Sequence, residues 1–111
     1  MNIDYKLLDL VKRKCYQVTD NDSDENILRL KDIILDAEIK VKNMIGIDDN
    51  FYKLHKKTLF TEPGEERDLL LNYCFYAWND KTEYFKHNYL DDILSLRSKY
   101  EIKYDRELAN E

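Results

Sequence analysis

The sequence predicts an all-α protein, a small bundle of four helices, and three observations support this fold class. The 111 residues include only two Gly and one Pro, which is little material for the turns of a β-sandwich or barrel. Apolar residues recur at steps of three and four over long stretches, the spacing of one stripe on a helix. Nine Tyr, four Phe and one Trp also provide enough apolar surface for a folded domain, although 37% of the residues are charged.

The first helix is expected from about Ile3 to Tyr16, and its last turn carries Lys12, Arg13 and Lys14. Cations at this position complement the negative end of the helix dipole, although a contact with nucleic acid is an alternative. The side chains expected to face the core are Leu7, Leu8, Val11 and Cys15.

The second helix, from Asp24 to Ile45, is the longest, and we expect it at the centre of the bundle. Either Asp22 or Ser23 can cap its first turn, and Gly46 can adopt the left-handed conformation that ends a helix. The expected stripe, with Ile34, Ala37 and Val41 as its core candidates, consists of Ile27, Leu30, Ile34, Ala37, Val41 and Met44, and it is widened by Leu28, Ile33, Leu35, Ile39 and Ile45.

An irregular arm is expected between the second and third helices, in residues 47–61. This segment is basic and aromatic at its centre and has no clean helical or alternating stripe. A loop of this length inside a small domain is usually functional. Two interpretations stand equally: the arm lies on a neighbouring subunit, or it folds back over its own helices. In the first interpretation the contact residues are Phe51, Tyr52, Leu54, Leu59 and Phe60.

The third helix is predicted from Glu65 to Trp78, with Thr61 as its capping residue and Pro63 just before its first turn. It is apolar nearly all round, which is typical of a helix enclosed on most sides. Because a chain of this size has few other helices to enclose it, we expect another subunit to bury part of it. Its candidate core residues are Leu70, Cys74 and Trp78, and Cys74, like Cys15, is expected as a reduced thiol.

A last helix is expected to begin near residues 81–82. From Lys99 onward the apolar positions fit either a strand or a continued helix, and the period of so short a segment does not decide between them. We therefore divide the chain into a helical domain, residues 1–99, and an amphipathic C-terminal tail, residues 100–111. The expected buried stripe of the last helix is Phe85, Tyr89, Ile93, Leu96 and Tyr100.

Residues that could carry chemistry are few and scattered. The two histidines, His55 and His87, have no spacing that would give a metal adjacent ligands. The acidic run 20–24 suggests calcium, but an EF-hand needs Gly and Glu where this chain has Glu25 and Lys31. There is also no Gly-rich phosphate loop and no nucleophile motif. We therefore expect no catalytic residues, no metal and no cofactor, and no enzyme activity.

The charge balance points away from a protein whose main task is gripping nucleic acid. The net charge is −5, whereas domains that bind phosphate backbones usually carry a clustered basic excess. No apolar run approaches the ~20 residues of a membrane span, so we expect no contact with a membrane.

The order of elements and three stretches of sequence carry a resemblance. A short helix, a long helix, an irregular loop and the apolar stretch 63–78 follow one another, then the aromatic–polar segment 76–80 and the closing element 95–100. In this order and these lengths the chain, from about Tyr5 to Tyr100, resembles the head–tail connector (adaptor) proteins of long-tailed bacteriophages.

The resemblance implies a structural component of the virion. Such proteins form a homo-oligomeric ring, commonly of twelve copies, beneath the portal, and extend the DNA channel to the stopper and tail. DNA would pass without sequence-specific binding, and an acidic wall is compatible with that passage. The expected location is the head–tail junction, and the host cytoplasm during assembly. The residues expected at the portal are Tyr100, Ile102, Tyr104, Arg106 and Leu108. The alternative is a small helical phage or mobile-element module that regulates or binds proteins.

Overall fold

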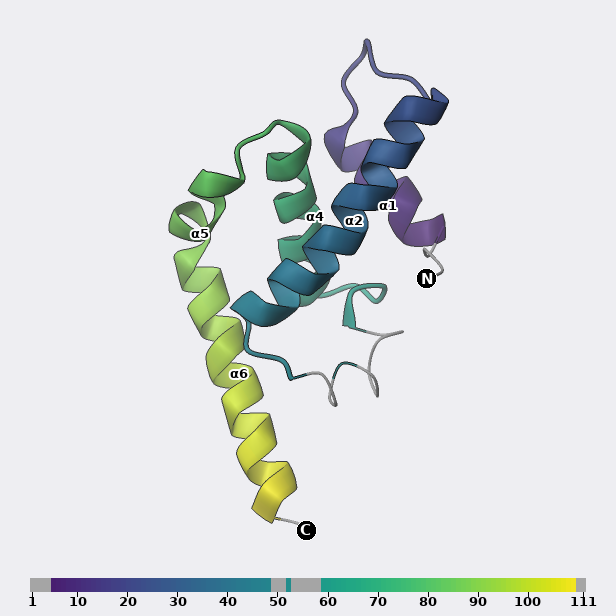
Figure 1. Cartoon of the computed structure of the whole chain (residues 1–111). Coiled ribbons are helices and arrows are strands. Elements are labelled where there is room, and N and C mark those ends of the chain that lie inside the picture. The colour runs from purple at the N-terminus through teal and green to yellow at the C-terminus, as the bar shows by residue number, and fades with distance from the viewer. Residues whose placement is uncertain (1–4, 49–51, 53–58, 110–111) are drawn as a thin grey trace.

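Six helical segments follow one another in the computed structural model, which describes residues 5–48, 52 and 59–109 (Figure 1). Within these ranges there is no strand, so the all-α prediction is confirmed. The segments are α1 (Tyr5–Cys15), α2 (Asp24–Met44), α4 (Glu65–Trp78), the 3-10 helix η1 (Thr82–Tyr84), α5 (Phe85–Asn88) and α6 (Leu90–Ala109).

The start and end of α2 follow the sequence signals closely. Ser23 has extended backbone angles, and its hydroxyl oxygen accepts a hydrogen bond from the Asn26 amide at 3.2 Å. This is the N-cap geometry, so Ser23 rather than Asp22 is the capping residue. At the other end Gly46 has a φ of 77°, in the left-handed region where a residue with a Cβ is strained. The helix therefore ends at Met44, one residue before the predicted boundary.

Helix α4, rather than α2, is the one most enclosed by the fold. It contacts α1, α2, η1 and α6, and it lies behind α2 in Figure 1. All six candidate core residues on α2 and α4 are buried, which confirms that part of the prediction. They are Ile34, Ala37, Val41, Leu70 and Cys74, with no exposed surface, and Trp78, with 8%. Both Cys15 and Cys74 are buried free thiols, as expected.

The start of α4 differs from the prediction. Gly64 is the N-cap residue, and no side chain caps the helix. Thr61 stands four residues before Glu65, too far from the first turn for its hydroxyl to serve as a cap. Its carbonyl oxygen instead accepts a hydrogen bond from the Arg67 guanidinium at 3.4 Å. The predicted bounds of this helix, Glu65 to Trp78, are nevertheless confirmed.

Arg29 of α2 closes the C-terminal end of α4. Its guanidinium carbon lies 4.3 Å from the centre of the Trp78 ring, and a guanidinium nitrogen donates to the Trp78 carbonyl oxygen at 2.6 Å. That carbonyl belongs to the last turn of α4, where no intrahelical donor is available. The indole also lies near the Tyr16 ring, with 5.6 Å between ring centroids. One side chain thus combines a cation–π contact with a helix cap.

The predicted last helix is divided into η1, α5 and α6. The division occurs at Tyr89, whose backbone leaves the helical region. Phe85 and Tyr89 stack with centroids 4.8 Å apart, and Tyr76 of α4 meets both rings edge-on. This aromatic cluster is a physical reason for the break. The buried stripe itself is as predicted, with Tyr89 partly covered and with Phe85, Ile93, Leu96 and Tyr100 buried.

Helix α6 continues without interruption across the predicted boundary between domain and tail at residues 99–100. The tail is therefore helical through Ala109, and the strand alternative is wrong. In Figure 1 the C-terminal half of α6 extends beyond the other helices. The longest dimension of the molecule is 52 Å, against 30 and 19 Å for the other two.

Candidate functional site

The expected arm residues that the structure describes belong to their own subunit. Leu59 and Phe60 are only 7% and 2% exposed, so they are core residues and not an exposed apolar surface. The Tyr52 hydroxyl donates to the Glu38 carboxylate at 3.1 Å, and its ring lies 6.4 Å from that of Phe60. Burial, and then the charge of Glu38, raise the pKa of Tyr52. For Leu59 and Phe60 the interpretation as an inter-subunit contact is wrong, because both side chains are buried in their own subunit, and the bond from Tyr52 to α2 favours the alternative in which this part of the chain folds back over its own helices. The other two, Phe51 and Leu54, lie outside the described residues.

Tyr100, expected as a portal contact, is also a core residue. It is 3% exposed, and its hydroxyl donates to the Glu66 carboxylate at 2.9 Å. The Lys99 ammonium donates to the same oxygen of Glu66. Burial alone would raise the pKa of Glu66, but the hydrogen bonds from Lys99, from its own backbone and from Tyr100 bring that pKa below its usual value. The expectation that Tyr100 is an exposed contact for the portal is wrong, because its side chain is buried and ties α6 to the start of α4.

Ile102 alone among the expected portal residues has a described, exposed side chain. It is 54% exposed on the projecting part of α6. Tyr104, Arg106 and Leu108 lie on the helical backbone of α6, but their side chains are outside the described part of the structure.

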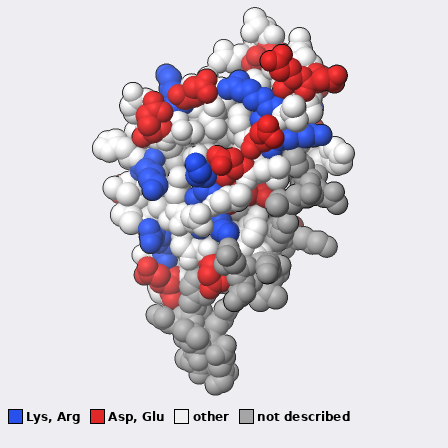
Figure 2. Space-filling model, in the orientation of Figure 1, with Lys and Arg blue, Asp and Glu red and all other residues white. Residues whose placement is uncertain are grey.

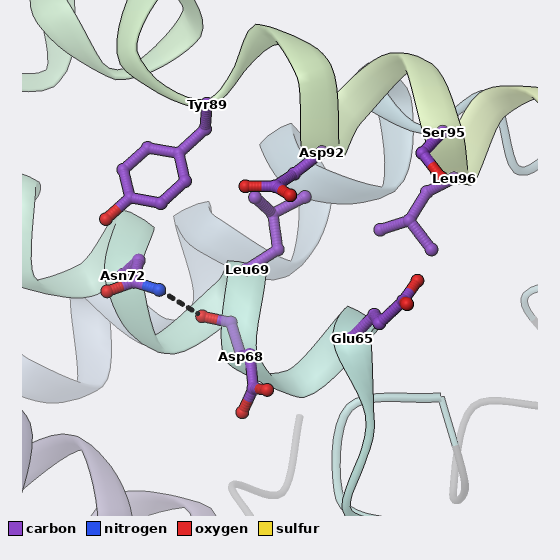
Figure 3. Close-up of a pocket in the computed structure, with 8 residues that line it drawn as sticks. All are labelled: Glu65, Asp68, Leu69, Asn72, Tyr89, Asp92, Ser95 and Leu96. Atoms are coloured by element: carbon purple, nitrogen blue, oxygen red, sulfur yellow. Dashed lines mark hydrogen bonds between the residues drawn. The ribbon is translucent and has the colours of Figure 1, made fainter.

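A cavity of about 260 Å³ lies between α4 and α6 (Figure 3). Its carboxylates are those of Glu65, Asp68 and Asp92, and no cation is among its described lining residues. Figure 3 shows that Asp68 points away from Asp92, while the Asn72 amide donates to the Asp68 carbonyl oxygen at 2.9 Å. The carboxylates do not converge on one point. Within the described residues, no group of three or more His, Cys, Asp or Glu could hold a metal ion. The volume is also below the ~300 Å³ at which ligand pockets usually begin.

A more open groove lies where the end of α2 meets α5 and α6. Its volume is about 370 Å³, and its apolar lining consists of Met44, Leu90, Ile93 and Leu94. Leu90 and Leu94 are 48% and 51% exposed. The charged residues that line the groove are all basic. They are Lys40, Lys86 and Arg97.

No family model, curated protein or solved structure matches this chain. The functional interpretation therefore depends on the surfaces that the fold presents. None of the helices in the described ranges has the length and apolar content needed to cross a membrane.

Helix α2 carries a second apolar surface, on the side away from the core. Leu28 and Ile39 are 62% and 53% exposed, and Leu35, which lies between them, is partly exposed. The expectation that these three residues widen the buried stripe is wrong. At about 100° per residue they fall within roughly 40° of one another, on the side of the helix opposite the core stripe. We call Leu28, Leu35 and Ile39 the outward stripe of α2.

Sequence reasoning missed the groove and the outward stripe, although part of the signal was present. The angular positions of Leu28, Leu35 and Ile39 follow from their numbers alone and separate them from Ile34 and Ala37. The groove had no comparable signal, because Lys40 and Arg97 are far apart in sequence and only packing brings them together. Both surfaces have the composition of protein-binding sites, apolar at the centre and charged at the rim.

Proposed function

We propose that this chain is a structural assembly subunit, a head–tail connector that forms a ring beneath the portal and extends the DNA channel to the stopper and tail. In this proposal α1, α2, α4 and α6 serve as a four-helix frame, and the work of the protein is to bind copies of itself and its neighbours in the virion. The site of action is then the head–tail junction.

The observation that carries the proposal is the shape and surface of α6. This helix extends beyond the rest of the molecule, and apolar residues remain exposed along it, with Leu90 at 48%, Leu94 at 51% and Ile102 at 54%. Leu90 and Leu94 are four residues apart on one face of α6, and exposed apolar side chains that adjoin one another often mark a surface that another molecule covers. The order of helices resembles that of the connector family, and this resemblance favours the portal as the partner.

The acidic balance of the chain supports the same role. With a net charge of −5, a ring of such subunits would present DNA with a mostly repulsive wall. On the face shown in Figure 2, basic residues are interspersed with acidic ones. That mixture does not favour the form of the alternative in which a regulatory module holds DNA on a basic face, and it does not separate the connector from a protein-binding module.

Co-sedimentation with portal-bearing heads tests this function. Truncation after Glu101 removes the projecting end of α6 but retains Tyr100 and its bond to Glu66. We expect the truncated subunit to fold with unchanged thermal stability and to lose binding to heads. A matched control is Val18→Ser, which changes a fully exposed apolar residue in the α1–α2 loop and should leave binding intact. Undiminished binding by the truncated subunit would contradict a portal contact on α6.

A further inference from the structure

We propose that the outward stripe of α2 in one copy docks into the groove between α2, α5 and α6 of a second copy, head to tail. This inference rests on the proposed function, because it names the surfaces through which an assembling subunit binds itself. It uses neither the arm nor the tail that the sequence suggested.

The groove is built to receive an apolar segment with negative charge beside it. Its apolar lining is open to solvent through Leu90 and Leu94, and no acidic residue is among its described lining residues. Lys86 and Arg97 form no ion pair with any other described residue. Unpaired cations around an exposed apolar surface favour a partner that brings carboxylates.

The outward stripe has that composition along one edge, while Lys31 and Lys42 follow its other edge. It extends over about 16 Å of helix, from Leu28 to Ile39, and Asp32 and Asp36 lie along it. Asp32 has no ion pair within the described part of the chain. An amphipathic helix with anchors at such spacings is a common occupant of an apolar groove.

Asp36 and Lys40 show how the two surfaces compete for charge. They pair with each other at 3.9 Å, and each side chain is 55% exposed. An ion pair as exposed as this one contributes little to the free energy of folding. Exchanging it for contacts with another subunit therefore costs little free energy. Asp36 belongs to the stripe and Lys40 to the groove, so one residue from each surface gains a new partner on docking.

The occupant of the groove is a second copy of this chain, because one chain carries both the groove and the stripe that complements it. Within one subunit the two surfaces touch only at their edges, through Asp36 and Lys40, and the apolar residues of the stripe cannot enter the groove because both surfaces are fixed to α2. Between subunits the contact joins different surfaces, so each bound copy keeps one stripe or one groove free. Such a head-to-tail contact continues until it closes into a ring or grows as a filament.

Charge reversal tests the contact. One full-length variant carries Lys86→Glu and Arg97→Glu in the groove, and a second carries Asp32→Lys and Asp36→Lys on the stripe. Sedimentation velocity over a concentration series measures self-association, and circular dichroism verifies that each variant is folded. We expect each double variant to associate at least about tenfold more weakly than the natural chain. An equimolar mixture of the two variants should regain association, because the reversed stripe then meets the reversed groove and the natural surfaces meet each other.

A matched control makes the result specific. Lys6→Glu and Asp9→Lys reverse two exposed charges on α1, away from both surfaces, and should leave association unchanged. Unchanged association of the groove and stripe variants, failure of the mixture to recover, or a natural chain that stays monomeric would each overturn the proposed contact. If the groove variant lost only portal binding and still self-associated, the occupant would be the portal and the inference would also fail. Because binding to heads is measured separately, the connector function survives each of these outcomes.

Discussion

Helices α4 and α2 differ in exposure in the opposite way from what their composition suggests. Helix α4 is apolar nearly all round, yet the only large apolar side chain that it exposes by more than a third is Phe75, at 38%. Helix α2 is amphipathic, yet it leaves Leu28 and Ile39 exposed by more than half. The apolar content of a helix therefore does not show where an interface lies. The exposed apolar surface depends on how many sides of the helix are covered by other parts of its own chain.

The difference arises from position in the fold. Helix α4 has α1 and α2 against it, and η1 and α6 cover further parts of its surface. Helix α2 has its strongest contacts with α4 and α1, on one side only. The expected neighbour for α4 is thus supplied within the subunit, and the apolar surface that remains open is on α2 and α6.

Replacing Trp78 by Ala should have the largest effect on stability. The indole is 8% exposed and contacts both the Arg29 guanidinium and the Tyr16 ring, so truncation leaves a cavity and removes both contacts. We expect the free energy of unfolding to fall by about 3–5 kcal/mol. Urea unfolding followed by circular dichroism is the measurement, because Trp78 is the only Trp and fluorescence would be lost.

Phe75→Ala is the matched control on the same helix. Its side chain is 38% exposed, so the cost should be clearly smaller than that of Trp78→Ala. Equal costs at the two positions would contradict the account of α4 as a helix whose enclosed side is set by its own chain.

Replacing Glu66 by Gln should have an intermediate effect. The carboxylate accepts hydrogen bonds from Tyr100 and Lys99 with only 12% of its side chain exposed, and such charged bonds are worth about 1.5–3 kcal/mol. We expect the thermal midpoint to fall at neutral pH. Thermal unfolding of both proteins across a pH series is the measurement.

The pH dependence of that difference has a definite sign. The folded-state pKa of Glu66 is below its ordinary value of 4.5, so its stabilisation is present above about pH 4.5 and is lost as the pH falls through the lower folded value. The gap between natural and Glu66→Gln midpoints should therefore close in acid. A gap that stayed constant down to acid unfolding would show that the carboxylate charge does not hold α6 on α4.

The smallest effect on stability is expected on the outward stripe. Leu28→Ser changes a side chain that is 62% exposed, so the free energy of unfolding should change by no more than about 0.5 kcal/mol. Self-association should weaken at the same time. A large loss of stability would mean that Leu28 serves its own subunit, and the contrast between α2 and α4 would then disappear.

The main helices were predictable because their signals are local. The apolar period, the Ser23 cap, Gly46 and the Pro63–Gly64 pair mark where α2 and α4 begin or end, and the core stripes follow from the same spacing. The break at Tyr89 was not predictable, since it depends on how Phe85 and Tyr76 meet across two helices.

The interaction surfaces were less predictable than the helices. The composition suggested α4, the aromatic residues of the arm and Tyr100 as interface candidates. Among the described residues of this set, nearly all are covered by packing within the subunit. What remains exposed depends on which helices are neighbours, a property of the whole fold. Leu28 and Ile39 show the limit clearly, because the helical period separates them from the core stripe without saying what covers them.

Negative-stain imaging and mass determination of the purified protein, alone and with its portal, test ring assembly itself. We expect ring-shaped particles whose mass is a multiple of the 13.5 kDa subunit in the protein alone, or the mass of such a ring added to that of the portal when the portal is present. A protein that remained a 13.5 kDa monomer in both conditions would contradict ring assembly.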